Sequence, residues 1–417
     1  MISNYRKIGD FIRQSKSRND NCRIKILLGV NLDKEFMPSV ANLNGVDLSR
    51  YKVIKKGQFG CKLMSVGRDK KVPISRLKNY DEAIISSAYF VFEVKNEIEL
   101  NSEYLMMWFS RSESDRFQWF QSGGDIRGRI TWEEFCSLPI KVPSIEKQRE
   151  IVKEYNTIIN RIKLNEQLNQ KLEETAQALY RHWFVDFEFP NENGQPYKSS
   201  GGKMIHNEEL DKEIPEGWSK ESIGTLANQF SGYSFKGEQY SFEEGITVVR
   251  GENVTEQKLR WDTHKMWSHE LNDRMKKCFL ENLDFVIGMD GSKVGKNWSL
   301  ISEYDLPLLL AQRVTCVRSI DRNFSIFLYL SLAVNDFEKY VSQVQTGTSV
   351  PHISAQQISD FSFPGPPLRL MPVFQETLEP IFNRVNLNLH INSKLENLRK
   401  ILLVRLSKTE ETKIEIV

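Results

Sequence analysis

The sequence predicts an α+β fold in which two similar globular domains are separated by two long antiparallel coiled-coil helices, so that the chain is pseudo-twofold symmetric. Two observations support this prediction. A motif of about fifty residues occurs twice, and each copy continues into a long stretch in which apolar residues recur every three or four positions. At 417 residues the chain is also too long for one ordinary core.

The duplicated motif begins at Ile130-Thr131, which aligns with Ile353-Ser354 at a shift of 223 residues. The register then holds without a gap. Aligned pairs include Leu138 with Phe361, Pro143 with Pro366, Ile151 with Phe374, Asn165 with Asn388, Asn169 with Asn392, and Leu172-Glu173 with Leu395-Glu396. Such a repeat predicts a pseudo-symmetric molecule with two like sites.

Residues 1–143 are expected to form the first globular domain, with aromatic or β-branched strands at 25–28 and 83–94 and a helix at 102–110. The segments that follow are a long helix, a turn-rich linker, a second globular domain, and a second long helix with a tail, at 144–186, 187–215, 216–366 and 367–417. Ser144 follows a proline and is expected to cap the first long helix. The second long helix is expected over 369–408.

Both long helices carry an apolar seam with the coiled-coil period. The seam of the first helix comprises Ile151, Tyr155, Ile158, Ile162, Asn165, Asn169, Leu172, Ala176, Leu179 and Trp183. That of the second comprises Phe374, Leu378, Ile381, Val385, Asn388, Asn392, Leu395, Leu402 and Leu406. Because each seam has two Asn at matching places, and seam Asn fixes register and partner, we expect the helices to pack on each other or on equivalent helices of partner subunits. Two unrelated amphipathic helices are the alternative.

The two globular domains share weaker similarities. The matching segments are 8–12 with 223–227, 28–31 with 250–253, and 83–94 with 308–317. A similar scaffold with divergent loops is typical of two domains that read different ligands.

Charge is balanced overall at +2, but the first domain contains a basic stretch. Between Arg50 and Lys78 there are ten Lys and Arg against one acid, Asp69. Such a stretch attracts phosphate backbones, and a solvated surface loop is the alternative with equal weight.

The composition, 40% hydrophobic and 27% charged, is typical of a globular protein. The chain contains no run of about 20 apolar residues that predicts a membrane span, and its first residues lead into no apolar signal core. The five cysteines include no C-x-x-C pair, which argues against a disulfide framework or a zinc site. We expect a reduced, cytoplasmic protein without membrane contact.

Motifs for catalysis are missing. The segment 291–297 resembles a phosphate loop, but it has one residue too few between its glycines and ends in Asn297 instead of Ser or Thr. Pro366-Pro367 lacks the polar and aromatic members of an adenine methyltransferase motif, and Asp81 with Glu93 is only distantly similar to a nuclease metal site. The histidines follow no zinc-binding pattern. We therefore predict no catalytic residue, metal or cofactor in this chain.

Two variable domains that alternate with two repeated long helices resemble the specificity subunit (HsdS) of type I restriction-modification systems. The matching segments are Ser122-Gly123-Gly124, Thr346-Gly347-Thr348, Arg129-Ile130-Thr131, His352-Ile353-Ser354, 138–148, 361–367, 168–187 and 214–218. The resemblance covers nearly the whole chain. The second copy departs from the family pattern at 370–374, where the usual Glu-Gln before the helix is missing.

The resemblance implies a non-catalytic subunit that binds double-stranded DNA. Each globular domain would be a target recognition domain that reads half of a bipartite site through the major groove, and the helices would span the unspecified spacer. The helices would also dock two modification subunits, which methylate adenine with S-adenosylmethionine. Restriction subunits, which use ATP for translocation and cleavage, would complete the complex.

Candidate DNA contacts follow from side-chain chemistry, because Arg and Lys suit guanine and Asn and Gln suit adenine. In the first domain they are Gln58, Lys62, Arg68, Lys70, Lys71 and Arg76. In the second domain they are Lys236, Gln239, Lys293, Lys296, Asn297 and Arg313. Phosphate contacts are expected from Arg127, Arg129 and His352, beside the Gly loops. For each residue, an ordinary surface position is an alternative of at least equal weight.

Two other functions stay open. A coiled-coil scaffold that binds proteins only is disfavoured by the basic stretch and the duplicated Gly loops. A self-sufficient nuclease or methyltransferase is disfavoured by the missing motifs.

Overall fold

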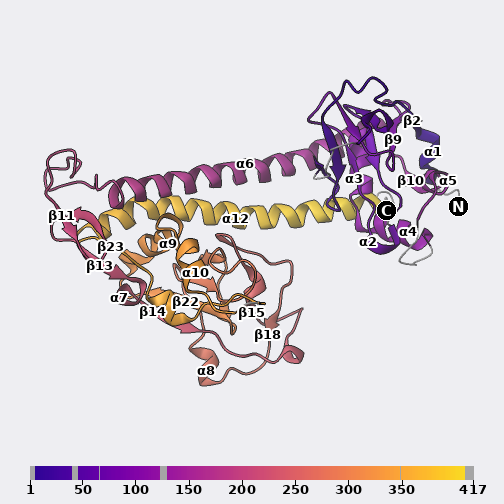
Figure 1. Cartoon of the computed structure of the whole chain (residues 1–417). Helices are drawn as coiled ribbons and strands as arrows, with labels where there is room; N and C mark the ends of the chain where they lie inside the picture. The colour runs from indigo at the N-terminus through magenta and orange to yellow at the C-terminus, as the bar shows by residue number, and fades with distance from the viewer. Residues whose placement is uncertain (1–4, 40–45, 65, 123–128, 348, 409–417) are drawn as a thin grey trace, which may run out of the picture. The chain divides into compact units, whose positions relative to one another are not determined.

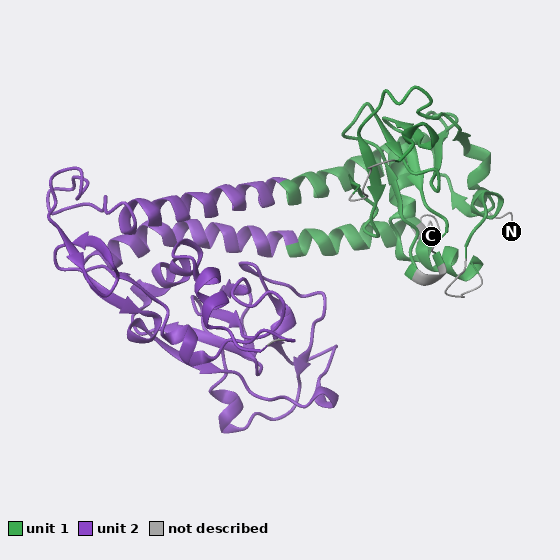
Figure 2. Cartoon of the chain, viewed as in Figure 1, with its two compact units in different colours: residues 1–163, 393–417 green, residues 164–392 purple. Residues whose placement is uncertain are grey.

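A computed structural model of the chain describes residues 5–39, 46–64, 66–122, 129–347 and 349–408. The chain forms two units, shown in Figure 2: unit 1 comprises Met1–Lys163 and Ser393–Val417, and unit 2 comprises Leu164–Asn392. Two long helices, α6 (Ile145–Phe184) and α12 (Leu370–Lys408), each contribute residues to both units. Within the described residues, no helix combines the length and apolar character needed to cross a membrane.

Unit 1 contains two four-stranded sheets. The first has the order β2-β9-β6-β7, with strands Ile12–Ser15, Phe90–Val94, Phe59–Cys61 and Ile74–Arg76. The second has the order β4-β3-β8-β5, with strands Phe36–Pro38, Leu27–Val30, Glu82–Ile85 and Lys52–Lys55. A further pair joins β1 (Tyr5–Lys7) to β10 (Pro139–Lys141). The short helices are α1 (Ile8–Phe11), α2 (Val66–Asp69), α3 (Ser102–Phe109), α4 (Ser112–Gln121) and α5 (Trp132–Cys136).

Unit 2 repeats this plan. One sheet has the order β14-β22-β19-β20, with strands Ala227–Ser231, Val314–Ser319, Phe285–Gly288 and Trp298–Leu300. The other has the order β18-β15-β21, with strands Met266–Trp267, Ile246–Val249 and Leu308–Leu310. A pair again joins β13 (Ser219–Ser222) to β23 (Ser362–Gly365). The corresponding helices are α7 (Ile223–Leu226), α9 (Ser325–Val334), α10 (Phe337–Val344) and α11 (Ala355–Ser359).

Several short elements of unit 2 lie outside this shared plan. They are the hairpin of β11 (Met204–Asn207) and β12 (Lys212–Pro215), the pair β16 (Val254–Thr255) and β17 (Lys258–Leu259), α8 (Asp273–Lys276), and the 3-10 turns η2 (Gly237–Gln239), η3 (Gly251–Asn253) and η4 (Arg322–Phe324). Unit 1 has one described 3-10 turn, η1 (Leu48–Arg50). The hairpin falls in the segment that the sequence predicted to be a turn-rich linker.

Strand registers relate the two units residue by residue. Ile12 pairs with Val94 in unit 1, and Ala227 pairs with Ser319 in unit 2. In both units the second sheet contains one parallel pair, β3 with β8 and β15 with β21. The duplication predicted from the sequence is therefore present in the topology of the sheets as well as in the helices.

The observed strands differ from the predicted ones in their bounds and in their register. Segment 83–94 does match the segment that begins at Leu308, but it forms two strands, β8 and β9, joined by a turn. The strand expected at 25–28 begins at Leu27, two residues later. The match of segment 28–31 with 250–253 is shifted by one residue. Leu28 pairs with Ile85, and Val249 pairs with Leu310, the equivalent of Ile85, so Leu28 corresponds to Val249 and not to Arg250.

The repeated Ile-Thr/Ser motif has the same structural role in both units. Ile130 and Ile353 are buried. The backbone N–H of Ile130 donates to Leu63 O (3.2 Å), two residues after β6, and that of Ile353 donates to Met289 O (2.9 Å), the first residue after β19. The next residue caps α5 or α11 through a capping box, in which Thr131 pairs with Glu134 and Ser354 with Gln357. The motif is therefore an anchor that joins a buried side chain, the segment after the end of an inner strand, and a helix start.

The two long helices pack on each other, as the shared Asn pairs predicted. In unit 2 the C-terminal half of α6 lies antiparallel to the N-terminal half of α12 (Figure 1). Asn165 Nδ2 donates to Asn392 Oδ1 at 2.7 Å, and Asn388 Nδ2 donates to Asn169 Oδ1 at 2.8 Å. All four side chains are buried. Buried amides tolerate only registers in which they are paired, so these bonds select the observed alignment.

Ser144 caps α6 as expected, since its Oγ accepts from Lys147 N at 3.4 Å. Near the start of α6, the buried Gln148 donates to Glu99 O (2.9 Å) and accepts from Asn101 N (2.8 Å), the residue that caps α3. The second copy has Met371 at this position, and a methionine side chain cannot make these amide hydrogen bonds. One turn further along α12, Gln375 accepts from Ile326 N of α9 at 3.3 Å, so an amide link to the corresponding helix is retained.

Replacing Asn392 with Ala should lower the stability of the chain by about 1–3 kcal/mol, because the buried amide of Asn165 loses its acceptor. The double change Asn165→Leu with Asn392→Leu should recover most of this loss, since an apolar pair leaves no buried donor unpaired. Thermal unfolding followed by circular dichroism measures both. Asn383→Ala, at an exposed position of α12, is the matched control. Equal melting temperatures for Asn392→Ala and Asn383→Ala would contradict a role for the pair.

Candidate nucleic-acid interface

The loops after β6 and β19 occupy equivalent places in the two units and contain most of the predicted cations. Both begin beside the Ile130 or Ile353 anchor. The loop of unit 1, residues 62–73, contains Lys62, Arg68, Lys70 and Lys71. The loop of unit 2, residues 289–297, contains Lys293, Lys296 and Asn297. These candidates were chosen by residue type in two segments of dissimilar sequence, and they lie on loops that are equivalent in the two units.

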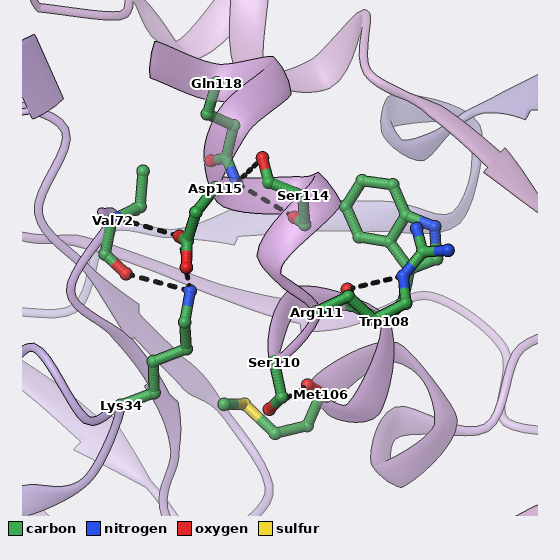
Figure 3. Close-up of polar contacts among 9 residues, drawn as sticks. All are labelled: Lys34, Val72, Met106, Trp108, Ser110, Arg111, Ser114, Asp115 and Gln118. Atoms are coloured by element: carbon green, nitrogen blue, oxygen red, sulfur yellow. Dashed lines mark hydrogen bonds and ion pairs between the residues drawn. The ribbon is translucent and has the colours of Figure 1, made fainter. Parts of the chain in front are cut away.

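The end of the loop in unit 1 is held by a buried ion pair, shown in Figure 3. Lys34 Nζ lies 2.7 Å from Asp115 Oδ1 of α4, and the two side chains are only 8% and 11% exposed. The same Oδ1 accepts from Val72 N at 3.1 Å, and Lys34 Nζ donates to Val72 O at 3.4 Å. Burial lowers the pKa of Lys34, and Asp115 opposes that shift. Val72 directly follows Lys70 and Lys71, so the pair fixes the backbone that carries them.

Lys70 and Lys71 are exposed, and Lys70 Nζ lies 5.5 Å from the centre of the Trp119 ring. Lys62 is half-buried, and Arg68 belongs to α2. Arg129 is exposed immediately before the Ile130 anchor, whereas Arg127 lies outside the described residues.

Two candidates of unit 1 are engaged within the protein. Gln58 is buried: its Nε2 donates to Glu93 Oε2 at 2.8 Å, and its Oε1 accepts from Lys55 N at 2.9 Å. With both amide atoms bonded internally, Gln58 does not present its side chain to a ligand. Arg76 forms an ion pair with Glu103 at 3.2 Å and lines a groove of about 970 Å³ together with Lys71.

The loop of unit 2 owes its shape to two glycines, Gly291 and Gly295, with φ of +102° and +82°. It joins two antiparallel strands, not a strand and a helix, so it is no phosphate loop of the nucleotide-binding kind. Lys293 and Lys296 are exposed and form ion pairs with Glu256 (3.2 Å) and Glu338 (2.8 Å). Asn297 is half-buried, and its backbone O accepts from Gly288 N at 2.9 Å.

Beside this loop, unit 2 contains a cavity of about 450 Å³. Its lining combines charged, polar and aromatic side chains, namely Phe235, Tyr240, Arg250, Asp290, Gln312 and Arg313. The predicted Lys236 and Gln239 are exposed in the short segment between the two aromatic lining residues. A concave surface with cations and aromatic rings suits a nucleic acid, whose phosphates and bases need both.

Asp290, in the lining of this cavity, contacts both Arg313 and His352. Arg313 Nη1 lies 3.1 Å from Asp290 Oδ2, and His352 Nδ1 contacts Asp290 Oδ1. The sequence prediction named Arg313 and His352 separately and missed Asp290, which lies 62 positions before His352. It also missed Arg250, which lies 5.8 Å from the Tyr240 ring. The available signal for Arg250 was the same as for Arg313, an arginine in the segment flanking a strand.

Metal ligands do not cluster in the part of the chain that the structure describes: no group of three His, Cys, Asp or Glu side chains there could hold an ion.

Gln58→Ala should lower the free energy of unfolding by about 1–2 kcal/mol at pH 7, because two hydrogen bonds of a buried amide are lost. The Gln58 hydrogen bond is the largest cause that lowers the pKa of Glu93 below its ordinary value of 4.5, followed by Arg13. A lowered folded pKa gives stability that is present above pH 4.5 and lost as the pH falls through the folded pKa. The difference between wild type and variant in urea unfolding should therefore shrink at lower pH. Gln239→Ala, at an exposed position, is the control. An unchanged unfolding midpoint for Gln58→Ala would instead leave Gln58 available as a reader.

Asp115→Ala should destabilise the chain by about 3–5 kcal/mol, because Lys34 would be left buried without its counter-charge. Thermal unfolding measures the loss. Asp33→Ala, an exposed acid in the same turn as Lys34, should change stability by less than about 0.5 kcal/mol. If the two variants unfold alike, the buried pair does not hold the loop.

Comparison with known proteins identifies the family that has this architecture. The family model of the type I restriction modification DNA specificity domain matches residues 63–174 and 215–397, more than half of the chain. The HindI specificity subunit of Haemophilus influenzae is 22% identical, over 96% of this chain and 97% of that protein. The MjaVIII specificity subunit of Methanocaldococcus jannaschii is 23% identical, over 76% of this chain and 72% of that protein.

Among solved structures, the type I restriction-modification S subunit from M. genitalium has a similar fold. Its TM-score is 0.57 at 14% sequence identity, over 96% of this chain and 95% of that chain. The duplicated fold, the two long helices and the two matched segments agree with one another. The chain belongs to the family of type I restriction-modification DNA specificity subunits.

Proposed function

We propose that this chain selects the DNA sequence on which a type I restriction-modification complex acts. Residues 1–143 and 216–366 are two target recognition domains, and each reads one half of a bipartite site in double-stranded DNA. The chain itself carries no catalytic residue and no cofactor. The observation that carries the proposal is that one topology occurs twice, with different side chains on the equivalent loops.

The loops support contact with DNA through their charge. Lys70 and Lys71 in one unit and Lys293 and Lys296 in the other are exposed at equivalent places, where cations can neutralise phosphates and release counterions. The ion pairs of Lys293 and Lys296 with glutamates are exposed, so exchanging these partners for phosphates costs little. The two loops differ in length and sequence, as expected for domains that read different half-sites.

The long helices, residues 144–186 and 367–417, set the unspecified gap between the half-sites and dock partner proteins. Docking is supported by apolar side chains that stay exposed on α6 and α12, namely Leu164, Leu168, Leu389, Leu398, Ile401 and Val404. We propose that two modification subunits bind here and bring S-adenosylmethionine to methylate adenine. Restriction subunits bind the assembled complex and hydrolyse ATP.

Co-expression with the modification subunit of the same system, followed by sequencing of methylated adenines in the host genome, tests this function. We expect a split motif, with two short halves around a fixed gap. Exchanging residues 1–143 for those of a relative should change one half and leave the other intact, which is the internal control.

A stable complex that neither methylates nor binds DNA would contradict the proposed function and favour a protein-binding scaffold. DNA cleavage or methylation by the purified chain alone would contradict its non-catalytic role.

A further inference from the structure

Among the three side chains of the cluster Asp290, Arg313 and His352, that of Arg313 is the most exposed, and the residue lies in a turn with an unusual backbone. It follows β21 and precedes β22, its side chain is 72% exposed, and its φ is +66°. A non-glycine residue in the left-handed region is uncommon and persists where the surroundings impose it. Its backbone O accepts from Met289 N at 3.0 Å, which ties the turn to the strand end that carries Asp290.

Asp290 orients the Arg313 side chain. Its carboxylate is 20% exposed and accepts from Arg313 Nη1 at 3.1 Å, while its other oxygen contacts His352 Nδ1. The backbone around it is held in place as well, because Gly291 N donates to Pro351 O (3.1 Å) and Ile353 N donates to Met289 O (2.9 Å). The carboxylate that positions the arginine is therefore attached to the rigid anchor of the unit.

An arginine held in this way suits a nucleobase better than a phosphate. In the described structure the guanidinium forms one ion pair, at Nη1, which leaves further N–H groups of its planar fork for a ligand. The major-groove edge of guanine offers two acceptors, O6 and N7, that match such a fork. The fork can also bind a phosphate, but the neighbouring carboxylate of Asp290 repels a phosphate and does not repel an uncharged base.

Unit 1 lacks this cluster. By the strand registers and the anchor bonds, the positions of Asp290 and Arg313 correspond to Met64 and Ala88. The position of His352 corresponds to Arg129 in the sequence repeat. The cluster is therefore a property of one recognition domain, and its effect should be confined to one half of the DNA site.

We propose that Arg313, positioned by Asp290 and His352, reads a guanine in the half-site bound by residues 216–366. This inference rests on the proposed function and assigns a base and a residue to it. Asp290 acts as a positioning residue, since it orients the arginine and does not touch the base.

The test compares methylation motifs of variants co-expressed with the modification subunit. Arg313→Gln should lower the preference for guanine at one position of that half-site by about 10- to 100-fold, with the other half and the gap unchanged. Arg313→Lys should also lose the preference but keep more of the overall methylation, because the charge remains without the fork. Asp290→Asn should weaken the preference at the same position.

Arg322→Gln is the matched control. Arg322 is also exposed in unit 2 and forms an ion pair with Glu379 at 2.6 Å, away from the residues that line the cavity, so the motif should be unchanged. Melting temperatures of Arg313→Gln and Asp290→Asn check that both variants fold. Arg313 is mostly exposed, and Asp290→Asn keeps the shape of the side chain.

Three results would overturn the proposal: a half-site without a guanine, a motif unchanged by Arg313→Gln, or a uniform drop in methylation at every site. The last result would assign Arg313 to a phosphate. Failure of the proposed function can be distinguished from failure of the Arg313 assignment. If the proposed function is wrong, the wild-type complex itself shows no split motif, and the guanine assignment falls with it.

Discussion

The antiparallel packing of α6 against α12 is the interaction on which the rest of the structure depends. It joins segments more than two hundred positions apart, as the Asn165–Asn392 bond illustrates. Each unit also completes its core with both helices: Ile151 and Leu406 contribute to the core of unit 1, and Tyr180 and Phe374 to that of unit 2. Separating the helices would expose apolar surface in both units, at about 25 cal/mol per Å².

In each unit, the residues that stabilise the fold are distinct from the loop residues proposed to contact DNA. Ile130 and Ile353 are buried and hold equivalent strand ends, whereas the loops that start there differ in length, charge and glycine content. A loop between fixed ends can change its side chains at little cost to the core. Asp290 serves both stability and recognition. Its backbone belongs to the anchor, and its carboxylate faces the cavity.

The long helices could be predicted almost to the residue, because a period sustained over forty residues and a capping serine specify a helix locally. The recurrence of the Ile-Thr/Ser motif likewise predicted the duplication. The sheets could not be predicted: their strands have two to six residues, and their pairing is nonlocal. For the same reason the burial of Gln58, a predicted DNA contact, could not be foreseen. The cavity escaped prediction because Arg250, Asp290 and Arg313 come from three separate strand ends.

The composition of the two units has a consequence for synthesis on the ribosome. Unit 2 is one contiguous segment, Leu164–Asn392, whereas unit 1 combines the first part of the chain with its last residues. Domains usually fold in the order in which they emerge. Here the order is inverted, because the nascent unit 1 must wait for the final turns of α12, including Leu406, while unit 2 closes first. The core of unit 1 is therefore complete only after the residues of α12 that follow unit 2 have been synthesised.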